Sequence, residues 1–208
     1  MSLDLFLLLL PIVVASLSLH ELAHAYMAWR LGDPTAKEQG RLTLNPIAHL
    51  DPLGTLMFAL TALLAGVPFG WAKPVPVDPR YFRRPKEGMA LVAVAGPAMN
   101  FVLALVALAV LRHAGLDGRA FNVVALAYLV NVILGLFNLI PIPPLDGSRI
   151  VGVLMDNATY ARWIALDAVG MLVVFGVFFL FQEEFALVLE SALDQVTRVM
   201  DVLVLTWA

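Results

Sequence analysis

Residues 5–29 read LFLLLLPIVVASLSLHELAHAYMAW, an apolar run that carries the polar motif His20-Glu21-Leu22-Ala23-His24 near its end. About 20 apolar residues cross the hydrocarbon core of a bilayer, so the run predicts a membrane-spanning helix. Two histidines four residues apart share one helix face and can hold one Zn²⁺, while the glutamate beside them can activate water. Ionisable groups are costly in lipid and indicate function. The stretch therefore predicts a zinc hydrolase embedded in a membrane.

The composition also favours a membrane protein. Apolar residues make up 61% of the 208 residues and charged residues only 14%, unlike a soluble domain. The net charge of −3 gives no reason to expect a nucleic-acid partner. Because the chain has no cysteine, disulfides, thiolate catalysis and cysteine-ligated zinc are excluded. A zinc site must then use histidine and carboxylate ligands.

The apolar segments predict the topology. Four are long enough to cross a bilayer, at residues 5–29, 88–111, 121–140 and 163–181. A fifth, residues 53–67, is shorter and leads into glycines and prolines, so we expect it to be re-entrant. That arrangement divides the Lys and Arg residues ten to three between the two sides, whereas a spanning fifth segment would divide them about seven to six. The positive-inside rule then predicts an external N-terminus and a cytosolic 30–87 loop.

A third metal ligand is predicted in residues 138–147, NLIPIPPLDG, where three prolines end a crossing and present Asp146 on irregular backbone. Such backbone is tolerated at membrane depth only where protein or a water-filled cavity surrounds it. Asp146 and His20 can meet only if their helices cross in the same direction, which a re-entrant 53–67 allows. Two alternatives stay open: Asp146 could form a turn outside the membrane, and Glu38 could be the third ligand.

This residue set predicts peptide hydrolysis. An open zinc site with three protein ligands lowers the pKa of a bound water to about 7, and Glu21 could take its proton and pass it to the leaving amine. A side-chain amide could stabilise the oxyanion. Asn138 is the first candidate and Asn100 the second, although either amide could instead bond to backbone freed by a nearby proline.

Three motifs in this order, HELAH at 20–24, GPAMN at 96–100 and NLIPIPPLDG at 138–147, resemble the site-2 protease family of intramembrane zinc metalloproteases, in its short bacterial branch. The resemblance implies that His20, His24 and Asp146 are the Zn²⁺ ligands and that Glu21 is the general base. It also implies regulated intramembrane proteolysis, in which the substrate is a transmembrane protein or peptide cleaved in or near the lipid bilayer.

We therefore expect an all-α polytopic protein of the inner or plasma membrane, with its active site toward the cytosolic face and a metalloprotease core at residues 1–182. Residues 40–44, GRLTL, and 73–77, KPVPV, are expected to form a short β-like loop on the cytosolic side that could pair with an unwound substrate. Residues 183–208 predict a C-terminal amphipathic helix that either lies at the membrane interface or associates with a second copy in a homo-oligomer.

Two other functions fit parts of the pattern. A metal-binding membrane transporter would use the His/Asp cluster but would need polar residues along a continuous path, and a non-proteolytic scaffold would only bind helices. Neither needs a general base, so loss of cleavage with zinc retained after replacing Glu21 by glutamine would support the protease, and a folded wild-type protein without zinc would favour the scaffold.

Overall fold

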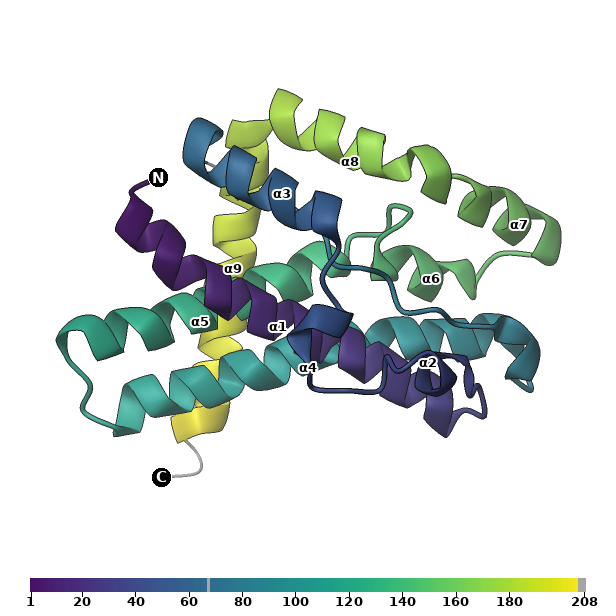
Figure 1. The fold of residues 1–208 in the computed structure, drawn as a ribbon, viewed down its shortest axis with the longest axis horizontal. Helices are drawn as coiled ribbons and strands as arrows, with labels where there is room; N and C mark the ends of the chain where they lie inside the picture. The colour runs from purple at the N-terminus through teal and green to yellow at the C-terminus, as the bar shows by residue number, and fades with distance from the viewer. Residues whose placement is uncertain (67, 206–208) are drawn as a thin grey trace.

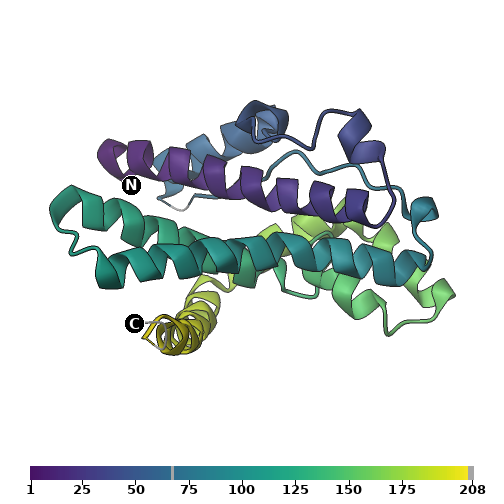
Figure 2. The same ribbon diagram turned by 90° about the horizontal axis from the view of Figure 1, so that it is seen from below.

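The structure, a computed structural model, describes residues 1–66 and 68–205, and helices dominate it (Figure 1). Among these residues, three helices are long and apolar enough to cross a membrane: α1 (Leu3–Arg30), α4 (Pro85–His113) and α5 (Gly118–Asn138). α4 and α5 form an antiparallel hairpin, and α1 packs along α4 (Figure 2). The predicted all-α fold is confirmed, and the three helices match the first three predicted crossings.

Local sequence explains where the long helices begin. The Ser2 hydroxyl caps α1 by accepting the Leu5 N–H at 3.3 Å. Pro85 occupies the first turn of α4, where its missing N–H costs no hydrogen bond. Shorter elements connect the long ones: α2 (Thr35–Glu38), η1 (Pro46–Ala48), η3 (Pro79–Tyr81) and α6 (Asp146–Gly152).

The fourth predicted crossing, 163–181, is bent. It falls on the end of α7 (Asn157–Ala165) and on α8 (Asp167–Leu180), and the two apolar stretches meet at an angle of 69°. α8 alone has 14 residues and is about 21 Å long, shorter than a hydrocarbon core of about 30 Å. The chain therefore has a fourth span only if α7 and α8 are counted as one broken helix.

The segment predicted to be re-entrant forms a short helical element, and the chain after it folds back alongside it. It forms α3 (Pro52–Leu60) and a π-helical turn, η2 (Thr61–Ala65), together too short to span. The returning chain lies alongside: the Thr61 hydroxyl accepts the Phe69 N–H at 2.8 Å and donates to the Phe69 carbonyl at 3.1 Å. An antiparallel bridge pairs Leu50 with Ala72. Val67, the last residue of the predicted segment, lies outside the described residues.

The predicted β-like loop is not confirmed. Within residues 1–66 and 68–205 no strand forms, and residues 40–44 and 73–77 are joined by a side chain instead of a ladder. The Arg41 guanidinium donates to the Lys73 carbonyl at 2.5 Å and to the Pro74 carbonyl at 2.9 Å. Pro74 and Pro76 have no N–H, so this segment lacks two of the donors that a regular ladder needs.

The C-terminal helix, α9 (Gln182–Leu205), crosses the α4–α5 hairpin and is seen nearly end-on in Figure 2. Met200 and Val204 are buried against α4 and α5, and the Arg112 guanidinium donates to both carboxylate oxygens of Asp201 at 2.9 and 2.8 Å. Part of the apolar face of α9 therefore packs against α4 and α5 of the same chain. The sequence predicted contact with the membrane interface or with a second copy, and neither prediction included this packing. The division between residues 182 and 183 stays a prediction, and residues 206–208 lie outside the described part.

Candidate active site

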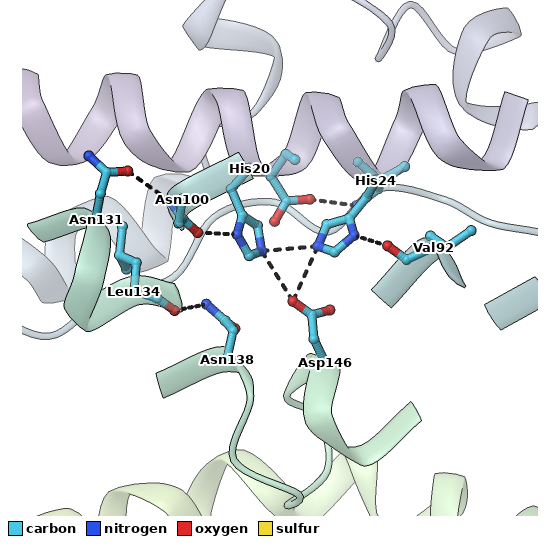
Figure 3. A network of polar contacts seen from close by, with 10 residues as sticks. His20, His24, Val92, Asn100, Asn131, Leu134, Asn138 and Asp146 are labelled. Atoms are coloured by element: carbon cyan, nitrogen blue, oxygen red, sulfur yellow. Dashed lines mark hydrogen bonds and ion pairs between the residues drawn. The ribbon is translucent and has the colours of Figure 1, made fainter. Parts of the chain in front are cut away.

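His20 and His24 on α1 and Asp146 at the start of α6 converge on one point (Figure 3). The two Nε2 atoms are 3.0 Å apart, and each lies 3.3 Å from the Asp146 Oδ2 atom. The donor atoms of a tetrahedral zinc, with bonds of about 2.0–2.1 Å, lie about 3.3–3.4 Å from one another. The triangle of donor atoms therefore fits a zinc ion, and both histidines are buried, with exposed fractions of 4% and 7%.

Hydrogen bonds on the far side of each ring turn both Nε2 atoms toward this point (Figure 3). The His24 Nδ1–H donates to the Val92 carbonyl at 2.7 Å, and the His20 Nδ1–H donates to the Asn100 Oδ1 at 2.6 Å. A neutral imidazole that donates through Nδ1 keeps a lone pair on Nε2, the form in which histidine binds a metal. The buried Asp146 Oδ2 has no hydrogen-bond donor, so this oxygen is also available to a cation.

Asn100 belongs to a buried chain of amides behind His20. Its Nδ2–H donates to the Asn131 Oδ1 at 2.9 Å, and the Asn131 Nδ2–H groups donate to the Ser16 hydroxyl and the Ala127 carbonyl, both at 2.9 Å. Both ends of the Asn100 amide are therefore engaged, and its oxygen faces His20. Asn131 and Ser16 were not predicted as site residues, although polar residues inside apolar helices were a usable signal.

Gly96 provides the space that the two imidazoles occupy between α1 and α4. A Cβ atom at this position would lie 2.3 Å from the His24 Nε2 and 2.5 Å from the His20 Cε1. The GPAMN motif thus has two functions at one site: Gly96 makes room for the rings, and Asn100, one turn later, orients one of them.

The loop after α5 presents Asp146 to the histidines. Residues 139–145 fold back so closely that a Cβ atom at Gly147 would lie 2.1 Å from the Leu139 carbonyl oxygen. The Asp146 Oδ2 lies 3.3 Å from each of the two Nε2 atoms, and an ionised carboxylate is the form in which aspartate binds metal ions.

A cavity of about 270 Å³ opens at this centre, and Glu21 and Asn138 lie in its wall. The Glu21 Oε2 accepts the Val75 N–H at 3.0 Å, and the Asn138 Nδ2–H donates to the Leu134 carbonyl of its own helix at 3.0 Å. Glu38, the rival ligand, lies exposed on α2 and is not part of the metal-binding group.

A second, larger cavity of about 490 Å³ adjoins the first and is almost entirely apolar. It runs beside the N-terminal half of α1, between that helix, α3 and α5. The two cavities share lining residues: Leu17, Phe69, Gly70, Trp71, Ala72, Leu134 and Phe137. An apolar surface therefore leads directly to the metal centre.

Comparison with known proteins gives consistent results. The sequence pattern described as peptidase family M50 matches residues 112–182. YwhC of Bacillus subtilis (strain 168), a candidate zinc metalloprotease, is 45% identical over 170 residues, which cover 77% of this chain and 75% of YwhC. Rip2 of Mycolicibacterium smegmatis, also a candidate zinc metalloprotease, is 35% identical over 145 residues, which cover 68% of this chain and 55% of Rip2.

One solved structure is also similar, that of the site-2 protease from Methanocaldococcus jannaschii. The match covers 89% of this chain and 73% of that chain, with a TM-score of 0.50 and 24% sequence identity. At this identity the likeness extends to the fold alone, and it agrees with the helical arrangement described above.

Proposed function

We propose that this chain, which belongs to peptidase family M50, the site-2 protease family of zinc metalloproteases, hydrolyses peptide bonds in or near the transmembrane helices of membrane-protein substrates. One observation carries the proposal: the His20 Nε2, the His24 Nε2 and the Asp146 Oδ2 meet within 4.8 Å of one another, in the wall of a cavity that also contains Glu21.

His20, His24 and Asp146 would hold the zinc. Bound there, the zinc would polarise the scissile carbonyl and lower the pKa of a water to about 7. The Val92 carbonyl and the Asn100 amide keep both imidazoles in the tautomer that ligation needs.

Glu21 acts as the general base and then as the general acid. Its carboxylate takes the proton of the attacking water and delivers that proton to the leaving amine. Asn138 lies in the same cavity wall, and its amide nitrogen carries two N–H groups, of which one donates to Leu134. We assign the other N–H to the oxygen of the scissile carbonyl, where negative charge develops.

The apolar cavity beside the metal centre supports a substrate drawn from the membrane. Its lining of aliphatic and aromatic side chains matches a transmembrane segment, whose peptide bond must leave its helix before it can be attacked. Because the surface leading to the centre is apolar, it does not favour the ion path that a metal transporter would need. The ten-to-three distribution of basic residues supports an orientation with the catalytic cavity toward the cytosolic side.

Glu21→Gln tests the proposal because it keeps the shape of the side chain and removes its proton acceptor. In the zinc-loaded protein, reconstituted with a membrane substrate, we expect unchanged zinc content and cleavage at least about 100-fold slower, within the usual range for loss of a general base. Glu38→Gln, at an exposed acid, is the matched control and should cleave normally.

A Glu21→Gln protein that cleaves at the rate of the unaltered chain would contradict the assignment. If Glu21→Gln is inactive, the membrane proteins that accumulate in cells carrying it, but not in cells carrying Glu38→Gln, are the natural substrates.

A further inference from the structure

Residues 73–77, Lys73-Pro74-Val75-Pro76-Val77, form a strap beside the catalytic cavity, and Pro74, Val75 and Val77 line it. The strap is tied at both ends: the Lys73 N–H donates to the His49 carbonyl at 2.8 Å, and the Asp78 N–H donates to the Asp33 Oδ2 at 2.7 Å. Each proline has a fixed φ and also restricts the residue before it, so the strap is stiff. Its Val75 N–H, between the two prolines, donates to the Glu21 carboxylate.

Arg41 holds the strap from the other side. Its side chain is buried, with an exposed fraction of 5%, and its acceptors are the neutral carbonyls of Lys73 and Pro74. Burying a guanidinium is costly, and its buried Nε has no acceptor, so a role in tethering the loop alone is a weak account of this position. Burial lowers the pKa of Arg41 below its ordinary value, and the Glu21 carboxylate acts in the opposite direction. The two charges therefore act on each other.

Arg41 and Glu21 bind opposite ends of one peptide group. The Pro74 carbonyl, which accepts from the Arg41 Nη1, and the Val75 N–H, which donates to the Glu21 Oε2, belong to the same planar unit. Fixing the oxygen of this unit therefore fixes the direction of its N–H. A cation at the oxygen and an anion at the hydrogen also polarise the amide in the same sense, which strengthens both hydrogen bonds.

We propose that Arg41 is a positioning residue for peptide hydrolysis: through the Pro74–Val75 peptide it holds the Oε2 of Glu21, so that the Oε1 is directed to the proton that Glu21 transfers. This inference rests on the proposed role of Glu21 as the general base. Arg41 itself does not contact the reacting atoms. Its effect is to keep the carboxylate in one orientation, and an error of about 1 Å in such a position can cost about 100-fold in rate.

Arg41→Ala, in the full-length zinc-loaded protein, tests this inference. We expect kcat for a membrane substrate to fall about 10- to 100-fold, as for other groups that orient a catalytic side chain, while KM and zinc content stay within about threefold. Added ethylguanidinium, which can occupy the vacated space, should restore part of kcat, and Arg41→Lys should retain more activity than Arg41→Ala. Arg80→Ala, at a 90% exposed side chain, is the control and should show neither the loss nor the rescue.

Val75→Pro provides an independent test because it removes the N–H but leaves both carbonyl acceptors of Arg41. We expect a similar fall in kcat that ethylguanidinium does not repair. An Arg41→Ala protein with unchanged kcat would overturn the inference. So would one that loses zinc together with activity and is not rescued, because a purely structural role predicts that result.

These outcomes are separable from the proposed function. If Glu21→Gln remains active, the general-base assignment fails whatever Arg41→Ala does. If Glu21→Gln is inactive with zinc bound and Arg41→Ala is fully active, only the positioning role fails.

Discussion

Gly96→Ala should remove the metal centre without altering any ligand. The new Cβ atom would lie 2.3 Å from the His24 Nε2, whereas ordinary van der Waals contacts begin at 3.4 Å. One of the two groups must therefore move by about 1.1 Å, the difference between these distances. Metal–ligand distances tolerate only about 0.2 Å. The shift is several times larger than that tolerance.

The rings have little freedom to absorb this displacement. His24 is held to the Val92 carbonyl at 2.7 Å and His20 to Asn100 at 2.6 Å, and both acceptors are on α4, the helix that carries Gly96. Separating α1 from α4 would break these bonds together. We therefore expect zinc affinity to fall at least about 100-fold, or about 2.8 kcal/mol at about 1.4 kcal/mol for each factor of ten.

The assay is zinc binding by competition with a chelator of known affinity, with cleavage of a membrane substrate measured in parallel. Gly176→Ala is the matched control, since a Cβ atom at this helical glycine of α8 would meet nothing within 4 Å. It should bind zinc and cleave as the unaltered chain does. Normal zinc affinity in Gly96→Ala would refute the reasoning, because it would mean that zinc does not bind where the two Nε2 atoms meet.

Three further results are expected. Removing zinc with a chelator should abolish cleavage in vesicles, and added Zn²⁺ should restore it; cleavage that persists with no zinc detected would contradict a zinc mechanism. Asn100→Ala should weaken zinc binding about 10- to 100-fold in the same competition assay, because the His20 Nδ1–H loses its acceptor; unchanged affinity would show that zinc binding does not depend on the hydrogen bond between His20 and Asn100. Because the chain has no cysteine, Val13→Cys in the apolar cavity should form a disulfide with single cysteines scanned through the membrane segment of a substrate; efficient cleavage with no cross-link at any position would exclude this cavity as a binding surface.

The convergence of the three candidate ligands was predictable from the sequence because two simple rules apply to their positions. The four-residue spacing of His20 and His24 places both on one face of α1, as helical geometry requires. Asp146 was harder to predict as a third ligand, since it lies far from the two histidines in the sequence. It could be identified because prolines end α5 just before it, and because the distribution of basic residues favoured the topology in which it can meet the histidines.

Other features depend on contacts that local sequence does not contain. The alternation in residues 40–44 suggested a strand, but its partner segment lacks N–H donors at Pro74 and Pro76, and Arg41 replaces the ladder. The fourth crossing was predicted as one helix because its run is apolar except for Asp167. In the structure Asp167, at the start of α8, pairs with Arg149 of α6, and the run is bent where α7 meets α8.

Asn100 illustrates a further limit. A buried amide near a zinc site could face the substrate or a ligand, and the motif alone is compatible with both. Only the fold shows that its oxygen meets His20, 80 residues earlier in the chain, and that its nitrogen is engaged by Asn131.

The two halves of the proposed catalytic site, the metal ligands and the general base, are held by different kinds of structure. His20 and His24 are fixed by Val92 and Asn100, both on the long helix α4, so their positions depend on helix packing. The Glu21 carboxylate is instead held by the 73–77 strap, which is irregular backbone secured by a few hydrogen bonds. Metal binding and base positioning should therefore respond to different substitutions: changes on α4 should alter zinc affinity first, and changes at Arg41 or Val75 should alter kcat while zinc stays bound.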